Sequence, residues 1–264
     1  MTSKLKALWS EGKATTNGWL CLPHVVSAEV MATLGWDSIT LDMQHGFVDV
    51  PDLVPLLAAL GNAGSAGPVP LVRVPWNDPG TIYRALDAGA QGIICPMVNT
   101  AAEAAALVAA TKYPPLGERS FGPVRMLVKY GPRYVAEANA TCLAIAQIET
   151  RQALENLGEI LAVKGLDAIY VGPADLAFDM GFPPHLDTEQ VVLLETYDRI
   201  VAAARKHGIA VAMHNMTPAY AARMVARGFN MVTFGSDVGC MLAAGQSAMA
   251  TFKGQGTAGT GSGY

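Results

Sequence analysis

The stretch that decides the fold is CLAIAQIETRQALENLGEILAVKGLDAIYVGPADLAFDM, residues 142–180. Its apolar run over 143–148 predicts a buried strand, and the spacing of apolar residues over 151–163 predicts a helix with one buried face. Gly165 ends that helix, and 166–171 is a second apolar run. The order strand, helix, strand is typical of two neighbouring parallel strands joined by a crossover helix.

Two carboxylates follow these strands. Glu149 comes after the first strand, and Asp175 follows the second, in a tight loop predicted over 172–175. Neighbouring parallel strands lie roughly 4.8 Å apart, so the two side chains can converge on one point. Either carboxylate alone could be only a helix cap. Gln147 lies on the same strand face as Glu149, which favours a site. Two carboxylates without an adjacent Cys or His suit Mg²⁺ or Mn²⁺ better than zinc.

The rest of the chain repeats this alternation. We expect strands over 19–22, 37–41, 70–74, 91–95, 143–148, 166–171, 209–213 and 231–234, and helices over 1–13, 27–34, 51–60, 79–89, 101–111, 133–139, 151–163, 188–206, 218–227 and 238–252. About eight strands alternating with helices predict an α/β fold, a (β/α)8 barrel, in a single domain over 1–253. The Gly- and Pro-rich segment 113–133 is expected to be a long loop, and the low-complexity tail, 254–264, to be disordered.

Polar residues gather where the predicted strands end. They are His24, Asp42, His45, Arg73, Glu149, Asp175, His214, Asn215 and Asp237. In a (β/α)8 barrel the carboxyl ends of the strands carry the active site. The pattern therefore favours an enzyme, although the fold alone names no reaction.

Arg73 and His45 are the candidate catalytic side chains. Arg73 leaves an apolar strand, and beside a metal its guanidinium suits a carboxylate or a developing enolate oxygen. His45 lies three residues beyond Asp42. It is therefore either a loop residue held by Asp42 or a general base that Asp42 orients. Asp87 is a second candidate partner for the histidine, unless it only belongs to a helix end.

Three further features concern substrate binding. The backbone N–H groups of Ala174 and Asp175 are placed to bind a ligand carboxylate. Arg119, in the long loop, either reaches an anionic ligand or lies in water. The lysines at 112, 129 and 164 lie in loops or helix ends and not inside a strand, which disfavours a Schiff-base mechanism,.

Composition excludes several classes of protein. The 264 residues are 51% hydrophobic and 15% charged, with a net charge of −4 and no basic run, which argues against nucleic-acid binding,. No apolar run approaches the ~18 residues needed to span a membrane, and the N-terminus lacks the apolar core of a secretion signal. The four cysteines are far apart, so we expect reduced thiols in a cytoplasmic protein,. Low charge and an apolar last helix predict a homo-oligomer.

Five motifs together resemble the HpcH/HpaI aldolase family. They are LDMQHG at 41–46, PLVRVPWND at 70–78, LDAGAQGIICPMV at 86–98, QIET at 147–150 and VGPADLAFDMG at 171–181. The resemblance covers nearly the whole chain. It implies a class II pyruvate aldolase on a barrel related to phosphoenolpyruvate-using enzymes, which depends on a divalent cation such as Mg²⁺, Mn²⁺ or Co²⁺. It also implies a hexamer with exchanged C-terminal helices.

The resemblance assigns roles to single residues. Glu149 and Asp175 would be metal ligands, Arg73 would stabilise the pyruvate enolate, and His45 would move protons. Asp42 would assist His45, as would Asp87, the latter across a subunit contact. Residues implied to line the pyruvate end are Trp19, Gln147, Gly172, Pro173 and Ala174. Gln44, where many members carry Glu, and the loop over 117–125 depart from the common family form, and both bear on the choice of aldehyde.

The expected reaction is the reversible aldol cleavage of a 4-hydroxy-2-oxo (2-keto-3-deoxy) acid. Its products are pyruvate, or a close analogue such as hydroxypyruvate, and an aldehyde. One alternative is a lyase of citramalyl- or malyl-coenzyme A type, for which the chain lacks a basic cluster to bind nucleotide phosphates. A second alternative is a non-catalytic barrel that binds a keto acid.

Overall fold

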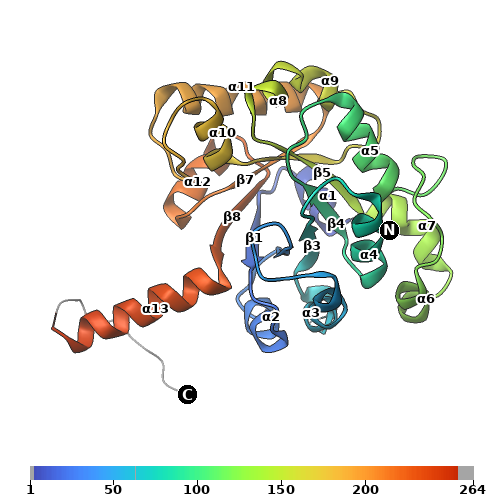
Figure 1. Ribbon diagram of the computed structural model, residues 1–264, viewed down its shortest axis with the longest axis horizontal. Helices are drawn as coiled ribbons and strands as arrows, with labels where there is room; N and C mark the ends of the chain where they lie inside the picture. Colours follow the sequence, from blue (N-terminus) through green and yellow to red (C-terminus); the bar gives the residue numbers. More distant parts are fainter. Residues whose placement is uncertain (1–2, 63, 255–264) are drawn as a thin grey trace.

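The computed structural model describes residues 3–62 and 64–254. Eight parallel strands close into a barrel in chain order (Figure 1). The strands are β1 (Thr15–Leu20), β2 (Ser38–Asp42), β3 (Val69–Arg73), β4 (Gly92–Cys95), β5 (Leu143–Ile148), β6 (Ala168–Val171), β7 (Ala210–His214) and β8 (Met231–Ser236). The predicted (β/α)8 barrel is confirmed.

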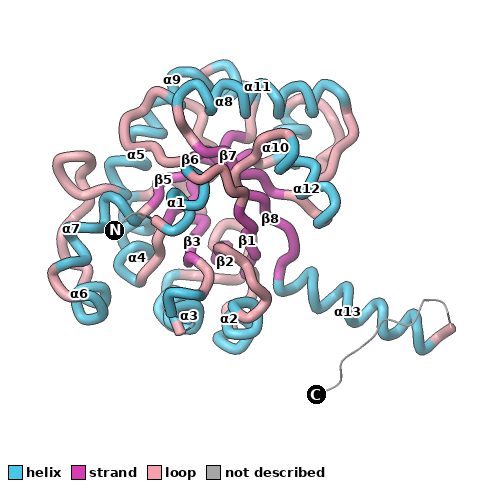
Figure 2. The backbone as a smooth tube through the Cα atoms, turned by 180° about the vertical axis from the view of Figure 1, so that it is seen from behind, coloured by secondary structure: helices cyan, strands magenta, loops and turns pink. Residues whose placement is uncertain are grey.

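Helices surround the barrel (Figure 2). They are α1 (Lys4–Ser10), α2 (Val25–Ala32), α3 (Leu53–Gly61), α4 (Pro79–Ala88), α5 (Ala101–Thr111), α6 (Val124–Tyr130), α7 (Arg133–Thr141), α8 (Arg151–Glu155), α9 (Leu157–Leu161), α10 (Pro173–Asp179), α11 (Val191–His207), α12 (Pro218–Ala226) and α13 (Asp237–Phe252), with short 3-10 turns at Val50–Asp52 and Gly64–Ala66. None of the helices in the described ranges combines the length and apolarity that a membrane crossing requires.

The register of the strands fixes which side chains meet at the carboxyl rim. Asp42 pairs with Arg73 across β2 and β3, and Ile148 pairs with Val171 across β5 and β6. The residues that follow the second pair, Glu149 and Gly172, therefore leave the sheet side by side.

The apolar residues form two layers. One cluster fills the inside of the barrel, with Leu71, Ile94, Ile145 and Tyr170 among its members, and Leu5 of α1 is part of it. A larger cluster lies between the strands and the outer helices. Because the interior is packed, a ligand can enter only at an end of the barrel.

Three predicted elements differ from the structure. β1 begins at Thr15, before the predicted start at Trp19, because the polar residues of its first half are buried and hydrogen-bonded inside the barrel. The helix predicted over 151–163 is two short helices that meet at Asn156. The tight loop predicted over 172–175 is instead the first turn of α10, with a proline at its first position, where the missing N–H is not needed,.

Two further expectations need correction. The long loop predicted over 113–133 contains α6, whose outward residues Val124 and Val128 are exposed. The helix predicted over 27–34 begins earlier, at Val25, and Ser27 lies inside it with its hydroxyl donating to Asp237. Apart from Gly254, the tail predicted to be disordered lies outside the described residues.

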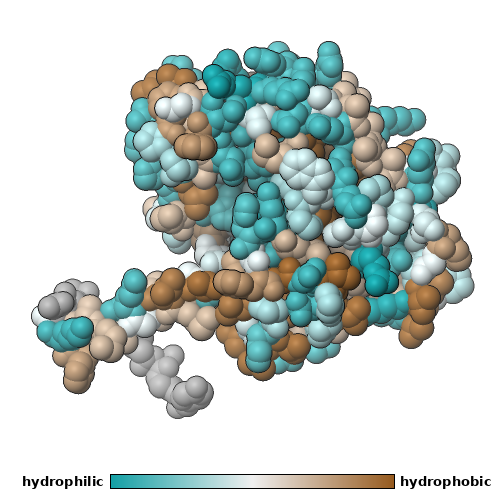
Figure 3. Space-filling model, viewed as in Figure 1, coloured by the Kyte–Doolittle hydropathy of each residue, from teal (hydrophilic) through white to brown (hydrophobic). Residues whose placement is uncertain are grey.

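Helix α13 projects away from the barrel (Figures 1 and 2). Its apolar side chains Met241, Leu242, Met249 and Phe252 are exposed, and Figure 3 shows hydrophobic residues along its length. Its first residue, Asp237, is buried and accepts hydrogen bonds from the backbone N–H groups of Cys21 and Leu22. The first residue of the helix is thus bound to the barrel, whereas the apolar side chains further along it are exposed.

Candidate active site

An ion pair between β2 and β3 forms one side of the site. Asp42 accepts hydrogen bonds from Nε of Arg73 at 2.9 Å and from Nη2 at 2.7 Å. Trp19 donates its indole N–H to the same carboxylate at 3.1 Å, and its ring centroid lies 4.8 Å from the guanidinium carbon. Burial alone would raise the pKa of Asp42, but the hydrogen bonds and charge of Arg73 hold it below its ordinary value,. The carboxylate is therefore ionised at neutral pH.

His45 lies in the turn after β2. Oδ1 of Asp42 accepts hydrogen bonds from the backbone N–H groups of Gln44 at 3.1 Å and of His45 at 3.3 Å. The side chain of His45 is exposed. Within one chain, Asp42 therefore orients the backbone of the turn that carries His45. It makes no hydrogen bond to the imidazole, which the general-base interpretation of the sequence required.

Glu149 is buried in a close-fitting cradle on the other side of the site. Only 2% of its surface is exposed. Oε1 accepts the backbone N–H of Met97 at 2.7 Å, and Oε2 accepts from Nε2 of Gln147. Met97 adopts a φ of 54°, in the left-handed region, and so its N–H is presented from a backbone conformation that most residues avoid,. A Cβ at Gly172 would lie 2.4 Å from Oε2, so any side chain at this position would displace the carboxylate.

The two sides of the site interact electrostatically. Burial raises the pKa of Glu149, the hydrogen bonds from Met97 and Gln147 lower it, the negative charge of Asp175 raises it further, and the charge of Arg73 lowers it,. Asp175 is exposed in the first turn of α10. Oε1 of Gln147 is buried and lacks a hydrogen-bond partner among the described residues. Two carboxylates, an unpartnered amide oxygen and a guanidinium therefore share one rim.

The remaining predicted residues of the α10 turn lie beside Gly172. Pro173 is buried at the first position of the helix, and Ala174 is half-buried next to it. Backbone N–H groups in the first turn of a helix have no partner inside that helix. This turn therefore adds donors to the rim on the Glu149 side.

Arg119 and Asp87 bind each other at the opposite end of the barrel. Nη2 of Arg119 lies 2.7 Å from Oδ1 of Asp87 and 3.1 Å from the hydroxyl of Tyr134. The guanidinium also stacks over Tyr113 at 4.5 Å, and Arg119 is only 2% exposed. Its partners lie beside Cys142, the residue that precedes β5. Within one chain, the structure thus places Arg119 and Asp87 at the end of the barrel away from Arg73, so the contact of Arg119 with substrate and the action of Asp87 across a subunit contact stay predictions.

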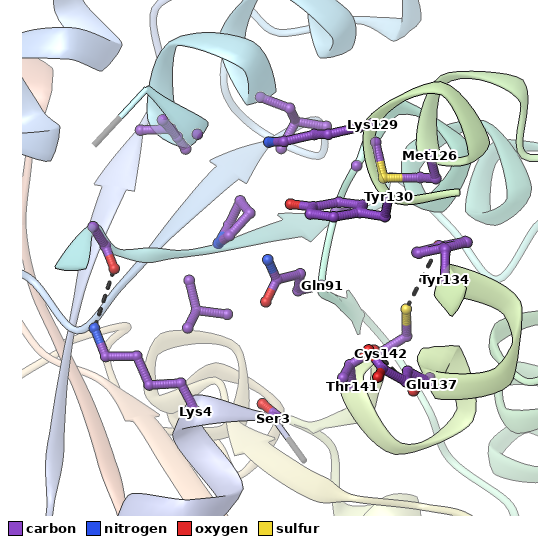
Figure 4. Close-up of a pocket in the computed structure, with 18 of the residues that line it drawn as sticks. Ser3, Lys4, Gln91, Met126, Lys129, Tyr130, Tyr134, Glu137, Thr141 and Cys142 are labelled. Carbon is purple, nitrogen blue, oxygen red and sulfur yellow. Dashed lines mark hydrogen bonds between the residues drawn. The ribbon is translucent and has the colours of Figure 1, made fainter. Parts of the chain in front are cut away.

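A cavity of about 490 Å³ opens at this same amino-terminal end. Gln91, Lys129 and Tyr130 line it, and Ser3 and Lys4 lie on its other side (Figure 4). None of the residues predicted for catalysis or metal binding lines this cavity. The cavity and the candidate active site therefore lie in different parts of the barrel.

Cys21 and Cys95, which interact electrostatically with Asp42 and Glu149 respectively, are not nucleophilic at neutral pH. Burial raises the pKa of Cys21 to about 11 and that of Cys95 to about 12, so both remain neutral thiols at pH 7,. Lys112 is buried at the amino-terminal end, where it binds Asp167 at 2.7 Å. The absence of lysine from the strands, noted in the sequence, extends to all eight strands of the described barrel.

A hydrogen-bonded chain inside the barrel escaped the sequence analysis. Tyr170 donates its hydroxyl to Thr233 at 2.7 Å, and the same oxygen lies 3.0 Å from Nδ1 of His214. Asn17 donates to Thr233 at 2.9 Å. The signal that could have found it is the presence of Asn and Tyr at inward positions of otherwise apolar strands, where a buried polar group needs a partner.

Comparisons with known proteins agree with this geometry. The family model for HpcH/HpaI aldolase/citrate lyase matches residues 17–244. A hydroxypyruvate/pyruvate aldolase from Rhizorhabdus wittichii is 41% identical over 94% of this chain and 98% of its own length. A 5-keto-4-deoxy-D-glucarate aldolase from Salmonella paratyphi C is 36% identical over 95% of this chain and 97% of its own. The crystal structure of an HpcH/HpaI aldolase/citrate lyase family protein from Burkholderia cenocepacia superposes with a TM-score of 0.88 at 30% identity, covering 96% of this chain and 100% of the other.

These matches place the chain among (β/α)8-barrel carbon–carbon lyases. The chain belongs to the HpcH/HpaI aldolase/citrate lyase family. The resemblance found in the motifs is confirmed, and so is the expectation of an aldolase-type enzyme. The citrate lyase β subunit from Mycobacterium tuberculosis, at 17% identity and a TM-score of 0.54, shares only the fold.

Proposed function

We propose that the protein catalyses the reversible aldol cleavage of 4-hydroxy-2-oxo acids to pyruvate, or a close analogue such as hydroxypyruvate, and an aldehyde. The activities of the relatives at 36–41% identity support this reaction class. The observation that carries the proposal is the buried carboxylate of Glu149 within the field of the Arg73 guanidinium. An anion-binding group beside a metal-binding group is what a 2-keto acid requires, because its carboxylate and keto oxygens are adjacent.

Glu149 and Asp175 are the residues that would hold a divalent cation. Oxygen ligands and the absence of a nearby thiolate suit Mg²⁺, Mn²⁺ or Co²⁺. Burial raises the pKa of Glu149 and the charge of Asp175 raises it further, and a cation would relieve both effects,. Such a cation supplies Lewis-acid stabilisation to the enolate that forms when the carbon–carbon bond breaks.

Arg73 would bind the oxygen on which negative charge develops. Its Nε and Nη2 are held by Asp42, and no described residue accepts a hydrogen bond from Nη1. The ion pair therefore fixes the guanidinium plane in advance and leaves the Nη1 amino group for the substrate,. A donor that is already oriented costs no reorganisation when the charge appears.

His45 would move the proton of the substrate hydroxyl. It is exposed at the mouth of the site, on a turn whose backbone is pinned by Asp42. This position suits a group that must exchange protons with water between turnovers. The backbone N–H groups of the α10 first turn, at Ala174 and Asp175, would bind the substrate carboxylate.

The test measures two activities of one preparation, with and without a chelator and with and without borohydride. Exchange of the pyruvate methyl protons in D₂O reports enolate formation without an aldehyde, and aldol cleavage reports the full reaction. Chelator treatment is expected to stop both, and borohydride with pyruvate is expected to leave activity intact. Activity that survives chelation, or pyruvate that becomes trapped on the chain, would contradict the metal-dependent assignment.

Variants then separate the two polar groups. Arg73→Lys is expected to slow exchange and cleavage alike, because both need the enolate. His45→Ala is expected to slow cleavage by about 10²–10⁴-fold and exchange by less. A fully active His45→Ala enzyme would remove the histidine from the reaction.

A homo-oligomer, with the hexamer of the family as its expected form, completes this proposal. The support is the bare apolar face of α13, on which Phe252 is 87% exposed. Exposed apolar patches of this kind are normally covered by a partner. Light scattering that gives the mass of a single chain at micromolar concentration would contradict it.

A further inference from the structure

His214 is a polar ring at the rim that the proposed reaction does not yet use. It ends β7 and is half-buried. Its imidazole meets Trp19 edge-on, with ring centroids 4.7 Å apart. Trp19 in turn carries the guanidinium of Arg73. His214 therefore lies one ring away from the group proposed to bind the enolate oxygen.

The chain of hydrogen bonds inside the barrel determines which nitrogen of His214 carries the proton. Ser38 donates to Oδ1 of Asn17 at 2.8 Å, which leaves the Asn17 amide nitrogen to donate to Thr233 at 2.9 Å. Tyr170 has one hydroxyl proton, and it goes to Thr233. Nδ1 of His214, 3.0 Å from the Tyr170 oxygen, must then be the donor in that contact,. Nε2 consequently holds a lone pair.

The imidazole is neutral as well as oriented. Burial and the nearby charge of Arg73 lower the pKa of His214 to about 4, against weaker opposing effects of Asp42 and Asp187,. Among the described residues Nε2 has no hydrogen-bond partner, and the ring is only half-buried. The edge that carries Nε2 is thus an acceptor open to whatever enters the site.

An acceptor at this position recognises only groups that carry a proton. Carboxylate and keto oxygens have lone pairs of their own, so they gain nothing from Nε2. A hydroxyl can donate to it. Because Arg73 is proposed to bind the oxygen on C2, a hydroxyl near the neighbouring ring belongs on the next carbon, C3 of the keto acid.

We propose that His214 accepts a hydrogen bond from a hydroxyl at C3 of the keto-acid donor and thereby selects hydroxylated donors such as hydroxypyruvate over pyruvate. Tyr170 acts as a positioning residue, since its oxygen holds the proton on Nδ1. This inference rests on the proposed aldol reaction and adds to it the residue that discriminates between donors.

The test compares two donors, pyruvate and hydroxypyruvate, and two acceptors, acetaldehyde and glycolaldehyde. The enzyme is the metal-supplemented oligomer. His214→Phe keeps a flat ring against Trp19 and removes the lone pair. Tyr170→Phe keeps the ring in the core and removes only the oxygen that holds the Nδ1 proton. His207→Phe, on the exposed end of α11, is the matched control.

In wild type we expect hydroxypyruvate to be favoured in kcat/KM. His214→Phe is expected to lower the hydroxypyruvate-to-pyruvate ratio by about tenfold to 100-fold, because a lost polar partner is penalised most when the substrate hydroxyl is left unpaired. Tyr170→Phe is expected to lower the ratio in the same direction by less, and His207→Phe to leave it unchanged. Calorimetric titration with each keto acid gives the same comparison as a ratio of Kd values, independently of turnover.

Three outcomes would overturn the inference. Equal losses for both donors in His214→Phe would make the ring only a support for Trp19. A change in the glycolaldehyde-to-acetaldehyde ratio instead would place the hydroxyl on the acceptor. Unchanged rates with both donors would leave no role for Nε2. Failure of the aldol proposal has a different signature, which is a wild-type enzyme that does not exchange the methyl protons of pyruvate.

Discussion

Two buried ion pairs, one at each end of the barrel, differ in whether the cation keeps hydrogen-bond donors that have no acceptor. At the amino-terminal end, the ammonium of Lys112 has three hydrogen-bond acceptors, Asp167 and the backbone oxygens of Asn139 and Cys142. All its donors are used. At the carboxyl end, Arg73 uses Nε and Nη2 on Asp42 and keeps Nη1. No donor of Lys112 is left for another partner, whereas Nη1 of Arg73 is left for the role proposed above.

Breaking the saturated pair should give the largest effect, and on stability alone. Lys112→Met removes one of the two lysines that bind Asp167, the other being Lys6 at 2.7 Å, and breaking a buried ion pair typically costs about 3–5 kcal/mol of unfolding free energy,. Urea denaturation measures this loss. The kcat of the fraction that remains folded should be unchanged, and Lys13→Met, on an exposed pair, is the control. A stable Lys112→Met protein with reduced kcat would reverse the distinction between the two ends.

Altering the unsaturated pair should reduce activity and spare the fold. Arg73→Lys keeps the charge near Asp42 but loses the planar fork and the free Nη1 donor. We expect kcat/KM for aldol cleavage to fall by about 10²–10³-fold, the range for removal of one oriented donor. The melting temperature should move little. Wild-type activity in this variant would show that the spare donor is not used.

The cradle of Glu149 offers a finer probe. Gly172→Ala places a methyl group 2.4 Å from Oε2 of Glu149 and forces the carboxylate to shift. Small misplacements of a reacting group typically cost about 10–100-fold in rate. Gly158→Ala, where nothing lies within 4 Å of the new carbon, is the matched control. Both variants are compared by cleavage rate and by half-saturating metal concentration.

The smallest predicted effect concerns pH. His214 has a folded-state pKa of about 4, below the ordinary value of 6.5, so between these two pH values the unfolded chain binds more protons than the folded one. Stability therefore rises with pH across this window and is lost as the pH falls. We expect His214→Phe to lose about 1–2 kcal/mol less than wild type between pH 7 and pH 5. Identical losses in urea titrations at the two pH values would contradict this.

Much of the fold was predictable because it is written in local patterns. The bounds of α5 and β5 agree with the sequence prediction residue for residue, and Asp78 and Gly89 cap α4 as their types require. The start of β1 was missed because Asn17 and its neighbours look like a loop. Only the closed barrel supplies the partners, Thr233 and Ser38, that allow Asn17 to be buried.

For the candidate site, the positions of residues could be predicted from the sequence but their hydrogen-bond partners could not. Residues at strand ends could be placed at one rim, because parallel strands end together, and the structure has Glu149 and Arg73 at that rim. Their hydrogen-bond partners could not be placed, since those depend on atoms from distant elements. Arg119 illustrates the limit. An arginine in a Gly- and Pro-rich loop looks available, yet it is buried against Asp87 and two tyrosines.

The anchoring of α13 has a mechanical consequence. Asp237 begins that helix and binds the segment that follows β1. It accepts hydrogen bonds from the N–H groups of Cys21 and Leu22 and from the hydroxyl of Ser27. That segment continues from Trp19, the ring on which Arg73 rests. The first turn of α13 is therefore connected through this segment to Trp19 and Arg73 at the carboxyl rim. If another subunit packs on the exposed part of α13, loss of that contact should disturb the segment after Trp19, so dilution below the dissociation constant of the oligomer should lower the specific activity before any strand unfolds.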